Sequence, residues 1–155
     1  MDKAKRVLVQ FWLKKAQRDL MAAQRLATEL PDIAIYHCQQ GAEKALKGFL
    51  ILHDQDPGDT HNINTLFKAA SAFRPEFTSA LKEAGYLSQY NQTYRYPREA
   101  TDDFNPTLGE LKKAYRIAQA VYMNVLQAMP PEIVGQTQRL QQSEQRREQD
   151  EELEL

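Results

Sequence analysis

The sequence predicts an all-α fold, an up-and-down bundle of four to five helices, and three observations carry this prediction. Apolar residues recur at helical spacing in several segments, no segment alternates like a strand, and capping or proline signals separate the segments. At 155 residues the chain has the length of one domain. Such a chain buries about two thirds of its unfolded surface, so it needs no internal disulfide, which its one cysteine could not form.

Two long helices are expected first. Residues 8–30 carry an apolar stripe at three- and four-residue steps, formed by Phe11, Trp12, Ala16, Leu20, Ala23, Leu26, Ala27 and Leu30. Pro31 ends this segment because proline disfavours the helical conformation of the preceding residue. Residues 32–53 form the second helix, with a stripe of Ile35, Ala42, Leu46, Phe49 and Leu50 that Ile51 and Leu52 widen. The Pro57-Gly58 pair then indicates a turn.

The rest of the bundle consists of shorter helices and one long closing helix. Thr60 or Asn62 caps a helix over residues 63–73, and Pro75 begins a fourth helix that buries Phe77, Leu81, Ala84, Leu87 and Tyr90. Residues 91–106 show no helical period. The fifth helix begins at Thr107, which has capping-box spacing with Glu110. Its predicted buried residues are Leu108, Leu111, Ala114, Ala118, Val121, Val125 and Met129.

The Pro130-Pro131 pair is the predicted end of the domain, so residues 1–130 form the bundle. Residues 131–155 are rich in Gln, Glu and Arg and are expected to be a frayed helix or a disordered tail. The formal net charge of −1 gives no global basic field for nucleic-acid backbone. No apolar run approaches the roughly 20 residues that span a bilayer, and we expect a soluble cytoplasmic protein.

Catalytic and metal motifs are scarce. His37, His53 and His61 lack the spacing of metal ligands, so we expect neither a metal nor another cofactor. Serine-nucleophile motifs and glycine-rich phosphate loops are also absent from the sequence. Cys38 has no second cysteine to pair with and fits a small core residue.

The second helix carries a polar stripe, "HCQQGAEKALK", in which His37, Gln40, Lys44 and Lys47 project to one side and Glu43 lies near that edge. One interpretation is a solvated face, where Glu43 and Lys47 form an i, i+4 pair that contributes roughly 0.3–0.5 kcal/mol. The other is a cationic stripe that meets a phosphate or another chain. The residue pattern alone favours the solvated face.

The segment "TYRYPRE" alternates aromatic and guanidinium groups through Tyr94, Arg95, Tyr96 and Arg98. Such groups can stack on bases and form forked hydrogen bonds to phosphates. Alternatively, Arg95 pins a long loop to the bundle by pairing with Asp102, Asp103 or Glu43.

Four segments together resemble a known family. "AQRDLMAAQRL", "YHCQQGAEKALKGFLILH", "THNINTLF" and "YRYP" are similar to the signature of the HEPN domain, over about residues 11–129. The resemblance implies a bundle of four or five helices that is usually paired as a homodimer. Many members resemble metal-independent ribonucleases with an arginine, four to six residues and a histidine near the dimer axis. Here no arginine precedes a histidine at that distance, and no histidine follows Arg95.

The branch with the Tyr-Arg-Tyr-Pro text is typically encoded beside a minimal nucleotidyltransferase. The resemblance therefore implies a nucleotide- and partner-binding member of a toxin–antitoxin-like pair, with no catalytic residue assigned. The expected nucleotide-binding residues are His37, Gln40, Lys44, Lys47, His61, Arg95 and Tyr96. Two alternatives remain open: an RNA endonuclease with a displaced active site, and a structural interaction module whose charged tail recruits a partner.

Overall fold

The computed structural model describes residues 1–97, 105–135 and 147, and these residues form helices and turns without a strand. Four α-helices account for most of the fold: α1 (Lys3–Leu26), α2 (Pro31–Leu52), α3 (Ile63–Phe73) and α5 (Leu108–Gln127). A short helix, α4 (Phe77–Ala80), and a 3₁₀ helix, η1 (Ala84–Asn91), connect α3 to the segment before α5. The predicted all-α class is therefore confirmed.

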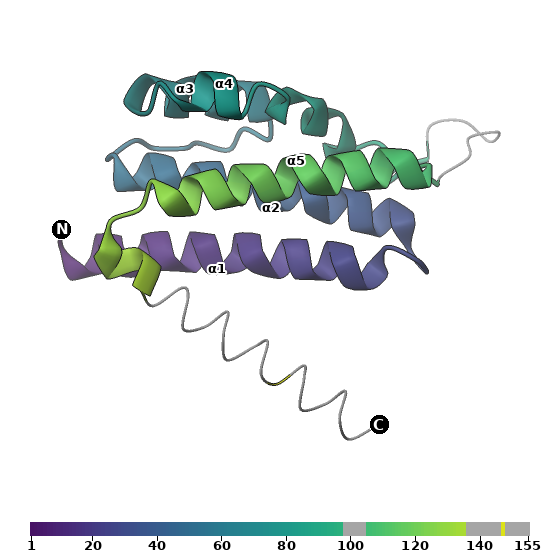
Figure 1. The fold of residues 1–155 in the computed structure, drawn as a ribbon, viewed down its shortest axis with the longest axis horizontal. Coiled ribbons are helices and arrows are strands. Elements are labelled where there is room, and N and C mark those ends of the chain that lie inside the picture. Colours follow the sequence, from purple (N-terminus) through teal and green to yellow (C-terminus); the bar gives the residue numbers. More distant parts are fainter. Residues whose placement is uncertain (98–104, 136–146, 148–155) are drawn as a thin grey trace.

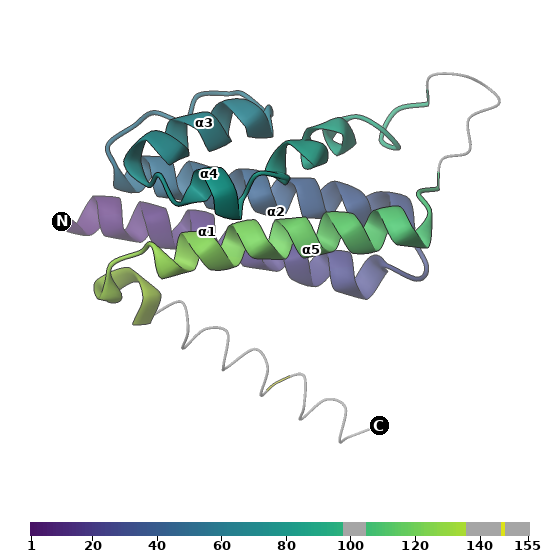
Figure 2. The same ribbon diagram turned by 45° about the horizontal axis from the view of Figure 1, so that its top comes forward.

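The helices form an up-and-down bundle in which the third member is broken (Figure 1). The helices α1 and α2 are antiparallel, and α5 runs in the same direction as α2. The segment α3–α4–η1 provides the return path and covers a different side of α2 from α1, as the tilted view confirms (Figure 2). The helix α2 packs against α1, α3, η1 and α5 and is thus the central element.

This central position explains why 14 of the 22 residues of α2 are buried. The helix α1 can approach closely because two glycines of α2 face it. An added Cβ at Gly41 would lie 3.1 Å from Leu20 Cδ2, and one at Gly48 would lie 3.1 Å from Trp12 Cβ. Since the two glycines are seven residues apart, they lie on the same side of α2. Larger side chains there would force the two long helices apart.

The predicted fourth helix is wrong as a continuous element. The chain instead forms α4, a turn over residues 81–83, and then η1. Its predicted buried residues are nevertheless all in the core: Phe77, Leu81, Ala84, Leu87 and Tyr90. The start of η1 lies so near α3 that a Cβ at Gly85 would collide with the Asn64 side chain. Contact with α3 therefore shapes this segment as strongly as its own helical period.

Three predicted core positions are wrong. Phe11, Leu30 and Leu108 are 57%, 42% and 64% exposed. The helix α1 begins earlier than predicted, at Lys3, where the Asp2 carboxylate accepts a hydrogen bond from Lys5 N at 2.8 Å. Its buried face comprises Val9, Leu13, Ala16, Asp19, Leu20 and Ala23. A stripe centred on Val9 and Leu13 necessarily turns Phe11 outward.

The predicted caps of α3 and α5 are confirmed. Asn62 Oδ1 accepts hydrogen bonds from Asn64 N and Thr65 N and caps α3. Thr107 Oγ1 accepts from Glu110 N at 3.0 Å and caps α5. The Glu110 carboxylate also accepts from the hydroxyls of Tyr90 and Tyr94 at 3.3 and 3.2 Å. The start of α5 is thereby tied to the end of η1.

The core extends past the predicted domain end at Pro130. Ile133 is fully buried and Val134 packs against the core. The division at residue 130 remains a prediction, and most of the predicted tail, residues 136–146 and 148–155, lies outside the described residues.

Candidate functional site

The Asp19 carboxylate, on α1, binds two side chains of α2. Asp19 Oδ1 lies 2.8 Å from His37 Nδ1, and Asp19 Oδ2 lies 2.7 Å from Lys44 Nζ. Because an ionised carboxylate can only accept, His37 Nδ1 carries the hydrogen. The second ring nitrogen, Nε2, is therefore the accepting atom of a neutral His37. The side chains of His37 and Lys44 remain 27% and 26% exposed, whereas that of Asp19 is only 9% exposed.

A second carboxylate, Glu43 on α2, organises the buried part of the stripe. Glu43 Oε1 lies 2.9 Å from His61 Nδ1, and Glu43 Oε2 lies 3.7 Å from Lys47 Nζ. Gln40 Nε2 donates to Gln39 Oε1 at 2.6 Å, and Gln39 Nε2 donates to Glu43 Oε1 at 3.2 Å. Gln39 also reaches the His61 carbonyl at 3.4 Å. These bonds connect α2 to the residue just before the cap of α3.

The stripe is therefore not a solvated face, and that interpretation of the sequence is wrong. Gln40 and Lys47 are only 9% and 5% exposed, and Glu43 is 3% exposed. The predicted Glu43–Lys47 pair exists, but inside the protein. A buried charge needs its partners because desolvation is costly. Lys44 and Lys47 each already neutralise a carboxylate.

Arg95 and Tyr96 form a third group with Tyr36. The Arg95 guanidinium carbon lies 4.4 Å from the Tyr36 ring centroid and 5.2 Å from that of Tyr96. Arg95 Nη1 also donates to the Asn91 carbonyl at 3.4 Å. No carboxylate of the described residues pairs with Arg95, and the proposed partner Glu43 binds other groups. Asp102 and Asp103 lie outside the described residues.

Tyr36 brings this group next to His37, since the two ring centroids are 5.6 Å apart. The seven predicted residues thus divide into three groups: His37 and Lys44 on Asp19; Gln40, Lys47 and His61 around Glu43 and Gln39; Arg95 and Tyr96 by Tyr36. The prediction missed Asp19, Tyr36 and Gln39. The position of Asp19 between Ala16 and Ala23 on the buried stripe of α1 is a signal that could have revealed it.

A polar cleft of about 480 Å³ adjoins His61. Residues at the start of α3 line one side and the end of η1 with the following turn lines the other; they are His61, Asn62, Ser88, Gln89, Asn91, Gln92 and Thr93. The buried Asn91 Oδ1 has no hydrogen-bond partner among the described residues. Such an orphaned acceptor is uncommon in folded proteins. The cleft is therefore a second candidate for ligand binding.

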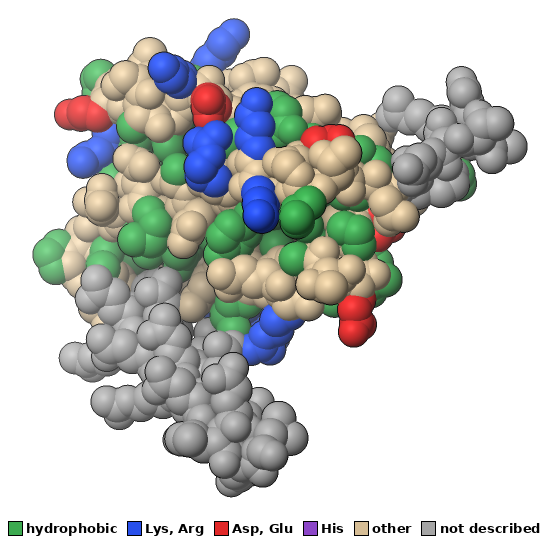
Figure 3. Space-filling model, turned by 45° about the vertical axis from the view of Figure 1, so that its right-hand side comes forward, with side chains coloured by type: hydrophobic (Ala, Val, Ile, Leu, Met, Phe, Trp, Pro, Cys, Tyr) green, Lys and Arg blue, Asp and Glu red, His purple; other side chains and the backbone are tan. Residues whose placement is uncertain are grey.

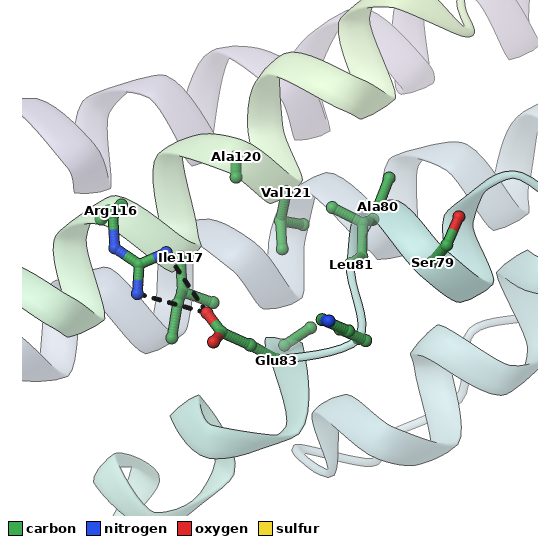
Figure 4. A pocket seen from close by; sticks show the side chains of 10 residues that line it. Ser79, Ala80, Leu81, Glu83, Arg116, Ile117, Ala120 and Val121 are labelled. Atoms are coloured by element: carbon green, nitrogen blue, oxygen red, sulfur yellow. Dashed lines mark hydrogen bonds and ion pairs between the residues drawn. The ribbon is translucent and has the colours of Figure 1, made fainter.

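A smaller hollow lies between the α4–η1 connection and α5 (Figure 4). Its volume is about 90 Å³, and its apolar side chains come from Ala80, Leu81, Ile117, Ala120 and Val121. At the rim, Arg116 donates two hydrogen bonds of 3.2 Å to Glu83 Oε2. Ligand pockets for small molecules measure roughly 300–1,000 Å³. This hollow is too small for a nucleotide.

Basic side chains gather near the middle of the face shown in Figure 3, which includes part of α5. The exposed cations of α5 are Lys112, Lys113 and Arg116. No histidine of the described residues is visible on that face. The face thus differs from the surface that carries His37 and His61, so its cations provide controls for that surface.

Metal ligation and thiol chemistry are not supported by the described residues. In residues 1–97 and 105–135, no three His, Cys, Asp or Glu side chains are arranged to hold a metal ion. Burial raises the pKa of the Cys38 thiol to about 12, although a backbone hydrogen bond opposes the shift. Cys38 is therefore a protonated core residue at neutral pH. No helix in the same ranges is both long and apolar enough to cross a membrane.

Comparison with known proteins identifies the fold family. The HEPN domain model matches residues 9–128, which is most of the chain and includes all seven predicted site residues. Searches of curated proteins and of solved structures gave no significant match. The match extends from α1 through α5, so it covers the complete bundle rather than one motif. The chain belongs to the HEPN domain family.

Proposed function

We propose that this HEPN protein is a non-catalytic nucleotide- and partner-binding module. It forms a homodimer and pairs with a minimal nucleotidyltransferase in a toxin–antitoxin-like system. The observation that best supports nucleotide binding is the exposed Arg95, whose guanidinium lies near the rings of Tyr36 and Tyr96. The sequence of the Tyr-Arg-Tyr-Pro segment, which resembles that of the paired HEPN branch, supports the partner.

Arg95 is suited to a phosphate because the protein already orients its side chain. Contact with an aromatic face uses the face of the guanidinium and leaves N–H groups at its edge for a forked interaction with an anion. One of these groups is used by the Asn91 carbonyl. Tyr96, which is 57% exposed, can stack on a base. His37 Nε2 can accept a hydrogen bond from a ribose hydroxyl.

The other predicted residues have supporting roles in this proposal. Lys44 holds Asp19, which orients His37. Gln40 and Lys47 support the Glu43 network, which orients His61. Their burial makes direct phosphate contact an unsuitable role for Gln40 and Lys47, and it gives them a positioning role instead.

Nucleotide binding is tested by titrating the purified full chain with ATP, GTP and short RNAs under calorimetry. We expect Arg95→Ala to weaken binding at least tenfold, because it removes a charged, oriented donor. Arg116→Ala is the matched control, since this exposed arginine pairs with Glu83 by the small hollow. If none of these ligands binds at millimolar concentration, or if both variants bind equally well, the nucleotide proposal is wrong.

Partner binding requires a separate experiment. The chain is purified alone and after co-expression with a neighbouring minimal nucleotidyltransferase, and the masses of the assemblies are measured. A homodimer that captures the enzyme supports the proposal. A monomer that does not bind it contradicts the paired-system part while leaving the nucleotide result unaffected.

A second candidate function is RNA cleavage through a displaced site. It is favoured by one observation: His37 and Arg95, which are far apart in sequence, both contact Tyr36. His37 Nε2 would accept the 2′-hydroxyl proton, and Arg95 would stabilise the charge on the phosphorane. The Asp19 contact at Nδ1 would hold the imidazole in the required tautomer.

RNA cleavage by the wild-type chain is the first requirement of this alternative. His37→Ala and Arg95→Ala should then each abolish most of the activity, while His53→Gln should retain it. Any cleavage that persists unchanged in the first two variants comes from another source and removes this alternative.

A further inference from the structure

We propose that the polar cleft beside His61 is an adenine-specific nucleoside pocket. This inference rests on the proposed function, because Arg95 would bind the phosphate of the same nucleotide. It adds a base-binding site that the seven predicted residues do not describe, apart from His61.

The cleft lining selects an uncharged polar ligand. Its side chains are hydroxyls, carboxamides and one imidazole, and none is a lysine, arginine or carboxylate. A free phosphate would find no fixed cation there, and a cation would find no anionic ligand. A volume of about 480 Å³ lies within the range of small-molecule pockets. A nucleoside moiety matches both the polarity and the size.

Several lining groups are already used by the protein. Asn62 Oδ1 caps α3, and Ser88 Oγ accepts from Ile63 N at 2.9 Å. Gln89 Nε2 donates to the Tyr86 carbonyl, and His61 Nδ1 contacts Glu43. The first N–H groups of α3 therefore bind protein atoms rather than forming an anion site.

The acceptor that remains is Asn91 Oδ1, which is buried without a partner among the described residues. A buried acceptor of this kind costs roughly 1–3 kcal/mol when it is not satisfied. A ligand that donates a hydrogen bond to Asn91 would recover this energy. A carboxamide fits adenine especially well, since it accepts from the N6 amine and donates to N7.

The cleft and Arg95 are connected through Asn91. Its side chain belongs to the cleft lining, and its main-chain carbonyl accepts from Arg95 Nη1 at 3.4 Å. A nucleotide whose base enters the cleft can thus direct its phosphate towards Arg95. The arrangement assigns the base to Asn91 and the phosphate to Arg95.

The test uses adenosine, inosine and ATP with the full chain, monitored by ligand-detected NMR and calorimetry. Inosine replaces the N6 amine by a carbonyl and so removes the donor to Asn91 Oδ1. We expect inosine to bind about tenfold more weakly than adenosine. Asn91→Ala should weaken adenosine by a similar factor, and Asn124→Ala, on α5 and outside the cleft lining, should leave it unchanged.

Arg95→Ala separates this inference from the proposed function. It should weaken ATP at least tenfold and leave adenosine within twofold, because adenosine has no phosphate. Equal binding of adenosine and inosine, or full adenosine binding by Asn91→Ala, overturns the adenine pocket. ATP binding that depends on Arg95 but not on Asn91 overturns the pocket while preserving the proposed phosphate site.

The reverse result is equally informative. Adenosine binding that depends on Asn91, together with ATP binding that ignores Arg95, supports the pocket and overturns the phosphate site. No binding of any of the three ligands at millimolar concentration overturns both. Circular dichroism and thermal melting check folding, and Asn91→Ala is expected to fold because it removes an unsatisfied buried acceptor.

Discussion

His37 Nδ1 lies 2.8 Å from Asp19 Oδ1, and this contact joins the two longest helices at the edge of the polar network. The other oxygen of the same carboxylate contacts Lys44 Nζ at 2.7 Å. Asp19 is thus both a structural link between α1 and α2 and the group that orients His37. Its removal should therefore affect stability before it affects any ligand.

Asp19→Asn is expected to lower the free energy of unfolding by about 2 kcal/mol, because hydrogen bonds to a charged group contribute roughly 1.5–3 kcal/mol. Urea denaturation followed by circular dichroism measures the change. Asp54→Asn is the control: its pair with Lys5 is on the surface, and its side chain is 81% exposed. Equal effects of the two substitutions would contradict a special role for Asp19.

Lys47→Met distinguishes a positioning role from direct ligand contact. Lys47 is buried beside Glu43, so its loss leaves that carboxylate with fewer partners and should cost about 2 kcal/mol or more of stability. Nucleotide affinity of the folded variant should remain within a few fold of wild type. Lys68→Met, on the exposed side of α3, controls for loss of a lysine. Lost affinity with unchanged stability would instead identify Lys47 as a ligand-contacting residue.

Protonation of His53 should destabilise the fold. Burial lowers the His53 pKa, the positive charge of Lys5 lowers it further, and Asp54 partly opposes the shift. The ring stacks on Phe73 with a centroid distance of 4.7 Å and meets Phe49 at 4.6 Å. The unfolded chain therefore binds the proton at a higher pH than the folded chain does.

The stabilising contribution of neutral His53 is complete above its ordinary pKa, about 6.5, and is lost as the pH falls towards the lower pKa of the folded protein. Thermal melting of wild type and His53→Gln between neutral and mildly acidic pH measures this difference. Stability of the wild type should decrease more steeply on acidification. The remaining titratable groups are common to both proteins, so parallel curves would refute the assignment.

Two truncations locate the functional end of the bundle. Ending the chain after Met129 removes the fully buried Ile133 and should cost about 1.5–3 kcal/mol. Ending it after Gly135 keeps Ile133 and should leave stability nearly unchanged. Chemical denaturation gives the comparison, and similar stabilities for the two products would show that Ile133 adds little.

The longer truncation product also tests the interaction-module alternative. If residues 136–155 recruit a partner, their removal should eliminate partner capture without unfolding the bundle. An unchanged set of captured proteins would exclude that role for the tail.

Helical periodicity and capping chemistry predicted most of the elements. The caps Asn62 and Thr107 were identifiable because their side chains act on backbone groups two or three residues away. The break between α4 and η1 was not identifiable, since it accompanies contact between Gly85 and Asn64 of α3. Phe11 and Leu108 fit helical stripes by spacing alone, but neither faces another described element closely enough to be buried.

The site divides in the same way. The sequence by itself determined that His37, Gln40, Lys44 and Lys47 share one side of a helix, because that follows from 3.6 residues per turn. Tertiary structure decided that this side is largely buried, since α1 contributes Asp19 and the residue before α3, His61, contacts Glu43. Burial depends on what packs against a helix, and such long-range contacts leave no periodic signal in the helix itself. The approach of Arg95 to Tyr36 likewise exists only in the folded chain.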